Sequence, residues 1–253
     1  MNTNAESRSL PLPEPPGFER VLVWDAPLRV FHWLMAACFA GACLTAGREG
    51  WRDLHQTLGY TMGGLVVFRI AWGFAGTRYA RFANFVRGPG EIAAYLRRMP
   101  RGWGRRHIGH SPAGAVAIIA LLLLTLATAV SGWASGDKPT ADGWWQEFHE
   151  GAALAMLALV GLHIAGIVFG SWRAGENLAR SMISGTKLGV PSEAIRSACY
   201  SVALLMLAAA AGFWGYQWAG AATVAASREQ LREEAREQPA STIEARREPG
   251  DND

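Results

Sequence analysis

Residues 147–172 read EFHEGAALAMLALVGLHIAGIVFGSW, a long apolar segment that contains two histidines, His149 and His163. Fourteen helical residues rise about 21 Å and return to within roughly 40° of the starting direction, so both imidazoles lie on one face of the predicted helix. A hydrocarbon core is about 30 Å thick, which places the two histidines near its opposite edges. Ionisable residues inside a membrane span are costly, and we therefore treat them as candidates for function.

Five apolar segments are long enough to cross a membrane, and helices are expected because lipid cannot satisfy free backbone groups. Their limits lie near 28–46, 58–75, 113–134, 152–171 and 198–218. The segment HSPAG indicates a helix start, with Ser111 as the N-cap and Pro112 in the first helical position. The predicted fold is an all-α membrane protein, with a four-helix transmembrane bundle plus a fifth transmembrane helix.

The arginine and lysine content of the connectors predicts the orientation of the chain. Eight arginines lie within 78–106, and the connector between the fourth and fifth segments holds Arg173, Arg180, Lys187 and Arg196. We expect both connectors to be cytoplasmic, which leaves the N-terminus cytoplasmic and the C-terminus periplasmic. The predicted organisation is an N-terminal arm at 1–24, the bundle at 25–190, an additional helix at 191–220 and a polar, partly disordered tail at 221–253. Within the tail we expect a short solvated helix through Arg236.

The remaining composition excludes several alternatives. Cys38, Cys43 and Cys199 form no CxxCH or CxxC motif, so neither covalent haem attachment nor a cysteine metal site is encoded, and we interpret them as small buried hydrophobes. The first residues lack the apolar core and cleavage site of a secretory signal, so the first apolar segment is expected to be an uncleaved anchor. The basic pI of about 9.0 comes mainly from one connector and predicts no nucleic-acid partner.

The histidines form two pairs at two depths. His32 lies near the cytoplasmic start of the first segment and matches the depth of His163, whereas His55 and His149 lie at the outer starts of the second and fourth segments. Bis-imidazole ligation of haem gives six-coordinate iron with no open site. We therefore predict a cytoplasmic-side haem iron held by His32 and His163 and a periplasmic-side haem iron held by His55 and His149. Separate two-histidine zinc or copper sites would lack ligands.

Arg69 follows His55 by fourteen residues and shares its helix face, at the depth of the cytoplasmic-side pair. An intramembrane arginine normally has a partner, and we expect a haem propionate or a quinone headgroup. Snorkelling toward lipid headgroups is the alternative. Trp33 and Trp72 are weaker candidates for a quinone site, and we interpret His107 and His110 as interfacial residues.

Glycines accompany the predicted ligands. Gly59 and Gly63 follow His55, and Gly166 follows His163 by three residues. A porphyrin against a helix needs missing side chains at such positions, but close helix–helix contact through small residues explains the same glycines equally well. Both interpretations stay open at the level of the sequence.

Several separated motifs resemble one family, the bacterial cytochrome b561 proteins together with the b-type cytochrome subunits of nickel–iron hydrogenases. The motifs are VWDAPLRVFHW (23–33), LHQTLGY (54–60), FRIAWGFAGTRYARFANF (68–85), GHSPAGA (109–115) and NLARSMISGTK (177–187). The resemblance covers about residues 20–190 and departs from the family pattern at Ser111, where asparagine is usual. It implies a four-helix bundle in the bacterial inner membrane with two non-covalent haem b groups ligated by His32, His55, His149 and His163.

The leading functional hypothesis is a di-haem cytochrome that carries electrons between the quinone pool and a periplasmic redox partner, either a c-type cytochrome or a hydrogenase-like enzyme. In that role the chain is a subunit of an oxidoreductase system rather than a stand-alone enzyme. The alternative is a stand-alone superoxide:quinone oxidoreductase of the cytochrome b561 type. A haem-free anchor or transporter is the third hypothesis, although no internal repeat supports it. The fifth helix is a candidate for docking a partner, and self-association into a homo-oligomer stays open.

Overall fold

The computed structural model describes residues 17–48, 50–86, 88–98, 108–136 and 143–237. Most of the N-terminal arm, His107 and the tail beyond Glu237 lie outside the described residues. Five helices in the described chain are long and apolar enough to cross a membrane. They are α1 (Ala26–Thr45), α2 (Arg52–Ala75), α5 (Pro112–Ala134), α6 (Trp144–Ala174) and α8 (Tyr200–Glu237). The predicted all-α membrane fold is confirmed.

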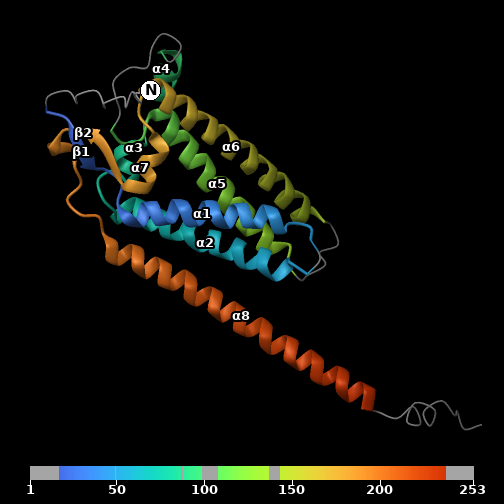
Figure 1. Ribbon diagram of the computed structural model, residues 1–253. Helices are drawn as coiled ribbons and strands as arrows, with labels where there is room; N and C mark the ends of the chain where they lie inside the picture. Colours follow the sequence, from blue (N-terminus) through green and yellow to red (C-terminus); the bar gives the residue numbers. More distant parts are fainter. Residues whose placement is uncertain (1–16, 49, 87, 99–107, 137–142, 238–253) are drawn as a thin grey trace, which may run out of the picture. The chain divides into compact units, whose positions relative to one another are not determined.

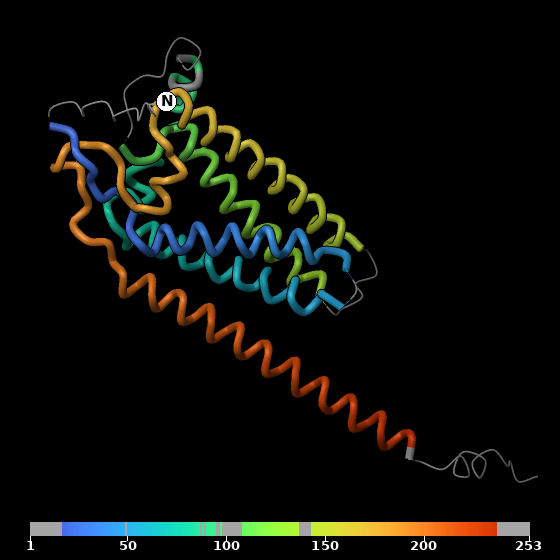
Figure 2. The backbone as a smooth tube through the Cα atoms, in the orientation of Figure 1, coloured from blue at the N-terminus to red at the C-terminus, as the bar shows by residue number. Residues whose placement is uncertain are grey.

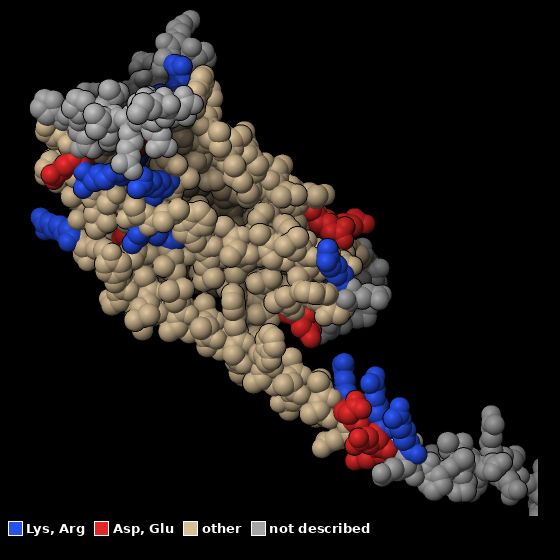
Figure 3. All heavy atoms as spheres, viewed as in Figure 1, with Lys and Arg blue, Asp and Glu red and all other residues tan. Residues whose placement is uncertain are grey.

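Helices α1, α2, α5 and α6 pack side by side as a bundle (Figures 1 and 2). Their shared core contains Cys38 of α1, Met62 of α2 and Met156 of α6, and partly buried Leu121 and Leu124 of α5 pack against it. Charged side chains gather at the two ends of the bundle, and the visible band between them is uncharged (Figure 3). That distribution suits a hydrocarbon environment around the middle of the bundle.

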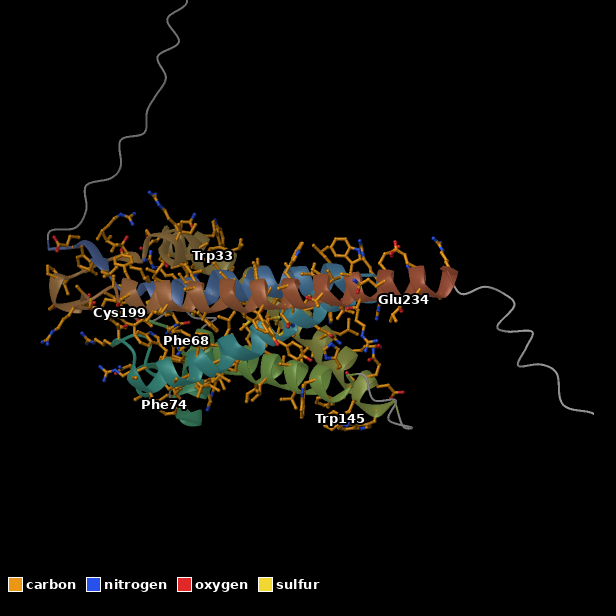
Figure 4. All side chains as sticks on the ribbon, turned by 90° about the horizontal axis from the view of Figure 1, so that it is seen from below. Trp33, Phe68, Phe74, Trp145, Cys199 and Glu234 are labelled. Atoms are coloured by element: carbon orange, nitrogen blue, oxygen red, sulfur yellow. The ribbon has the colours of Figure 1, made fainter. Side chains whose placement is uncertain are left out.

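Two helices begin well before the limits that hydropathy predicts. Helix α2 begins at Arg52 instead of near 58, and α6 begins at Trp144 instead of near 152. Both first turns carry an acidic residue, Asp53 or Glu147, which the partial positive charge of a helix N-terminus favours. The early starts place the outer histidines inside regular helix. Trp145 lies where α6 begins (Figure 4), as expected for an interfacial aromatic residue.

Side-chain caps fix the starts of α1 and α5. The Asp25 carboxylate accepts a hydrogen bond from the Leu28 backbone N–H at 2.8 Å. Ser111 Oγ likewise accepts from the Gly114 N–H at 3.1 Å, with Pro112 in the first turn. The predicted N-cap at Ser111 is therefore confirmed, and serine fills the capping role of asparagine.

A small folded cap covers one end of the bundle. We call this end of the bundle the strand end. Strand β1 (Glu19–Leu22) pairs antiparallel with β2 (Thr186–Gly189), and Leu22 is opposite Thr186. The cap also includes α3 (Phe82–Phe85), α4 (Pro89–Arg98), α7 (Leu178–Ser184) and η2 (Pro191–Glu193). Its core consists of Val21, Val23, Trp24 and Leu28. Our sequence analysis did not predict this strand pair, because four-residue strands leave almost no periodicity.

Helix α8 is continuous from Tyr200 through Glu237 and crosses residue 220, where we placed a boundary between helix and tail. Its sequence after Gly220 is rich in alanine, arginine, glutamate and glutamine, which are strong helix formers, and nothing there interrupts the helix. The chain divides into two compact units between Met206 and Leu207, so most of α8 belongs to the second unit. Its last turns carry charges of both signs (Figure 3), including an exposed Arg232–Glu229 pair at 3.9 Å.

Candidate functional site

His55 and His149 lie next to each other at the end of the bundle opposite the strand end. His55 is in the first turn of α2 and His149 is in the second turn of α6. Their ring centroids are 6.1 Å apart, with an angle of 74° between the ring planes. Two metal–nitrogen bonds of about 2 Å each fit between rings at this separation. The structure therefore brings together the two outer histidines that depth matching had paired.

The Nδ1 atom of His55 is held by helix α1. It lies 3.0 Å from the Ala42 carbonyl oxygen and 3.3 Å from Thr45 Oγ1. A carbonyl oxygen only accepts hydrogen bonds, so Nδ1 must carry the proton and donate it. In that tautomer Nε2 keeps its free lone pair, which is the form of histidine that binds a metal.

Helix α5 holds His149 in the same way. His149 Nδ1 lies 2.9 Å from the Thr128 carbonyl oxygen and 3.3 Å from Ser131 Oγ. In both sites the hydroxyl residue lies three positions after the carbonyl residue. Each hydroxyl also donates to its own helix, since Thr45 bonds the Gly41 carbonyl at 2.8 Å and Ser131 bonds that of Ala127 at 2.7 Å.. Two helices thus fix two imidazoles by matched contacts.

Gly132 makes room for the His149 ring. A Cβ atom at this position would lie 2.9 Å from His149 Cε1. The glycines singled out from the sequence behave differently: a Cβ at Gly63 would lie 3.6 Å from Ala129 Cβ, whereas one at Gly59 or Gly166 would meet nothing within 4 Å. A Cβ at Gly63 would thus make only an ordinary van der Waals contact with α5, and Gly59 and Gly166 lie beside open space.

His32 and His163 lie toward the strand end, on α1 and α6. The His32 ring packs edge-on against Trp33 with centroids 5.1 Å apart, and His163 is near enough to interact electrostatically with His32. His32 Nδ1 is buried and has no hydrogen-bond partner among the described residues. Among the described residues, His32 therefore lacks the Nδ1 hydrogen bond that fixes each outer histidine.

No group of three or more histidine, cysteine, aspartate or glutamate side chains in the described part of the chain could hold a metal ion. Structural zinc sites use four protein ligands, and catalytic ones use three. Each histidine pair offers two imidazole nitrogens, so a metal held there would need further ligands from another source. A porphyrin supplies such ligands, so the residues present fit haem better than a bare ion.

Arg69 is buried near the strand end of α2, with 2 % of its surface exposed. Its guanidinium carbon lies 4.9 Å from the centre of the Phe82 ring and 5.8 Å from that of Phe85. Both terminal nitrogens lack a hydrogen-bond partner among the described residues. Snorkelling would leave the guanidinium exposed, so this geometry speaks against that alternative.

Asp25 connects the start of α1 to the end of α2. Its carboxylate is fully buried, and the oxygen that does not cap α1 accepts from Trp72 Nε1 at 3.1 Å and from Thr77 Oγ1 at 2.6 Å. Trp33 Nε1 donates to the Met182 carbonyl at 3.1 Å. The indole donors of both tryptophans that we considered for a quinone site are thus used within the protein.

His110 lies inside the strand-end cap, between two aromatic rings. Its ring centroid is 4.6 Å from that of Trp24 and 4.7 Å from that of Phe85, and its Nδ1 is buried with no hydrogen-bond partner among the described residues. Burial, and then the charges of Arg69 and Lys187, lower the pKa of His110 to about 3. We interpreted His110 from the sequence as an interfacial residue, and that interpretation did not predict its packing against Trp24 and Phe85. The one related signal in the sequence is its position next to the Ser111 N-cap.

The fold and the facing imidazoles define a multi-pass helical membrane protein with paired histidine sites. The family model of prokaryotic cytochrome b561 matches residues 23–185, which include the four paired histidines and Arg69. The chain belongs to the prokaryotic cytochrome b561 family, and the resemblance found in the sequence is confirmed. It is thus a b-type cytochrome of membrane electron transfer in bacteria. No curated protein and no solved structure matched the chain.

Proposed function

We propose that the protein carries electrons through the inner membrane on two haem b groups, between the quinone pool and a periplasmic redox partner. His55 and His149 hold the periplasmic-side iron, and His32 and His163 hold the cytoplasmic-side iron. The observation that carries this proposal is the 6.1 Å separation of the His55 and His149 rings, each with Nδ1 bonded to a backbone carbonyl.

Haem iron, when bound, supplies a one-electron couple whose potential depends on its axial ligands and surroundings. Two histidines would hold each haem, so the residues of this chain would favour electron transfer over oxygen chemistry. The carbonyls of Ala42 and Thr128 hold each outer imidazole in the ligating tautomer and orientation. Because α1 and α5 are fixed in the bundle, these imidazoles need little rearrangement when the charge of the site changes.

The two pairs divide the membrane crossing into steps. His149 and His163 are on the same helix, and fourteen residues of α6 separate them by about 21 Å. A rigid helix keeps both sites at fixed depths, and the second ligands come from α2 and α1. An electron can therefore cross most of the hydrocarbon core through two sites instead of one long transfer.

The proposed function includes an orientation of the chain in the membrane and a redox partner at the periplasmic surface. The strand end carries the arginine-rich connectors and faces the cytoplasm, which leaves the His55–His149 pair near the periplasmic surface. The partner there is a c-type cytochrome or a hydrogenase-like subunit, and the fifth helix, α8, is a candidate for docking a partner. In this account the bundle at 25–190 is the electron-transfer domain.

Single-histidine variants test the assignment of the two sites. We expect His149→Ala to lose the periplasmic-side haem and keep the other, and His163→Ala to do the reverse, as measured by haem-to-protein stoichiometry in detergent. Gln146→Ala is a matched control, because Gln146 is exposed on the same helix and its side chain donates to Glu150 in a surface pair at 2.7 Å. Unchanged stoichiometry in both histidine variants would refute the ligand assignment.

A further inference from the structure

Three unpartnered nitrogens of the strand end belong to two neighbouring side chains. They are Nη1 and Nη2 of Arg69 and Nδ1 of His110, all buried and without a hydrogen-bond partner among the described residues. Both side chains pack on Phe85, with the Arg69 guanidinium carbon 5.8 Å and the His110 centroid 4.7 Å from its ring centre. A buried donor without an acceptor is unfavourable, so this arrangement indicates a missing acceptor.

The charged side chains near Arg69 and His110 already make hydrogen bonds within the protein. Asp25 is the acid whose charge reaches Arg69, and its oxygens accept from Leu28, Trp72 and Thr77. Lys187, whose charge reaches His110, donates to the Ile108 carbonyl at 3.0 Å. Among the described residues, Arg69 therefore has no acceptor for its terminal nitrogens, and its positive charge favours an added anion.

The walls of the site are aromatic and tightly placed. The Phe82 ring occupies the space next to Gly73, where a Cβ atom would overlap it, and this packing positions Phe82 under the Arg69 guanidinium. Trp24 and Phe85 cover the two sides of His110. Apolar walls exclude water and strengthen a hydrogen bond between a guanidinium and a carboxylate, which often forms with both oxygens.

We propose that Arg69 and His110 together bind a carboxylate of the cytoplasmic-side haem, with the Arg69 guanidinium as the charged donor and the His110 Nδ1–H as a second donor. The inference rests on the proposed function, because His32 and His163 place that haem at the same end of the bundle as Arg69. His110 acts as a neutral donor, since its pKa lies far below 7. A quinone oxygen is an acceptor of related chemistry, and the experiment separates the two sources.

The test is a spectroelectrochemical titration of the full-length holoprotein, freed of quinone in detergent. The His149→Ala and His163→Ala variants first assign the two potentials. Arg69→Gln removes a cation that favours the reduced haem, so the midpoint potential of the cytoplasmic-side haem falls while the other is unchanged. His110→Phe lowers the same potential by a smaller amount, and His110→Gln, which keeps an N–H donor, restores most of it. Arg78→Gln is the control, because Arg78 is an exposed arginine of the same end that packs on Tyr79.

Reconstitution with haem dimethyl ester, whose propionates are blocked, provides the second arm. The ester removes the negative charge of the propionates, so it raises the potential in the unaltered protein, and the downward shift caused by Arg69→Gln becomes smaller because no carboxylate is left to pair with Arg69. A potential that stays unchanged in Arg69→Gln, or that shifts equally in the propionate and ester forms, overturns the inference, even if quinone binding weakens, because the acceptor would then be a quinone. Should Arg69→Gln fail to fold, the shift of His110→Phe in the two haem forms decides. Two haems with unshifted potentials refute this inference alone, whereas fewer than two haems in the unaltered protein refute the proposed function as well.

Discussion

His149 Nδ1 lies 2.9 Å from the Thr128 carbonyl oxygen, and the equivalent contact of His55 with Ala42 measures 3.0 Å. Each contact joins the start of one helix to the end of the preceding one. In each of the two hairpins, α1–α2 and α5–α6, a backbone carbonyl of the first helix therefore fixes a histidine of the second. Each hairpin orients one imidazole toward the other hairpin and leaves its Nε2 free.

The hydroxyl next to each carbonyl is expected to contribute to haem retention. Thr45→Val removes the oxygen that lies 3.3 Å from His55 Nδ1 but keeps the Ala42 carbonyl. Loss of one such hydrogen bond costs about 1 kcal/mol, so haem should dissociate roughly fivefold faster from the periplasmic-side site. Stopped-flow transfer of haem to an acceptor protein measures the rate. Thr57→Val is the control, since the Thr57 hydroxyl bonds only the Asp53 carbonyl of its own helix. Equal rates in the two variants would contradict the assignment.

The spans, the proximity of His55 and His149 and the N-cap at Ser111 could be predicted from the sequence, because these depend on helical period and local hydrogen bonding. The sequence did not predict the position of His110, since the rings around that residue come from Trp24 and Phe85, far away in the chain. Nor did it predict the engagement of Trp72, which depends on Asp25 at the start of another helix. Contacts between distant segments leave no periodic signal in a single sequence.

Gly132 is expected to be intolerant of any side chain. In Gly132→Ala the new Cβ would lie 2.9 Å from His149 Cε1, so the imidazole must move out of its ligating position. Overpacking of this kind costs about 1 to 3 kcal/mol, which corresponds to a loss of affinity for one haem of about fivefold to 150-fold. The measurement is haem titration of the haem-depleted protein. Gly64→Ala on α2 should bind normally, because a Cβ there meets nothing within 4 Å. A Gly132→Ala variant that binds both haems as tightly as the unaltered protein would contradict the geometry.

Asp25 is expected to stabilise the junction between α1 and α2. Asp25→Asn keeps one carbonyl-type oxygen, so it cannot serve both the Leu28 N–H and the donors from Trp72 and Thr77. Unsatisfied buried donors cost about 1 to 3 kcal/mol each, and the thermal midpoint in detergent should fall by several degrees. The control is Asp53→Asn, an exposed acid in the first turn of α2 that should cost less than 1 kcal/mol. Similar midpoints for the two variants would show that the Asp25 network adds little.

Acid is expected to destabilise the haem-depleted protein partly through His110. Its pKa is lowered to about 3 in the folded chain, against an ordinary value of 6.5. Below pH 6.5 the unfolded chain binds a proton that the folded chain does not, so the contribution of His110 to stability is complete above that pH and is lost toward pH 3. The thermal midpoint should therefore fall less between pH 7 and pH 5 in His110→Phe than in the unaltered protein. A fall of equal size in both would show that His110 titrates normally.

The central claim is that four histidines hold two haems, and a pyridine haemochrome assay of the purified chain tests it most directly. The assay identifies the haem type and, with the protein concentration, gives the number of haems per chain. Our account predicts two haem b per chain, with a dithionite-reduced spectrum typical of six-coordinate, low-spin iron. A single haem would contradict the assignment of one histidine pair, and the absence of haem would contradict the proposed function.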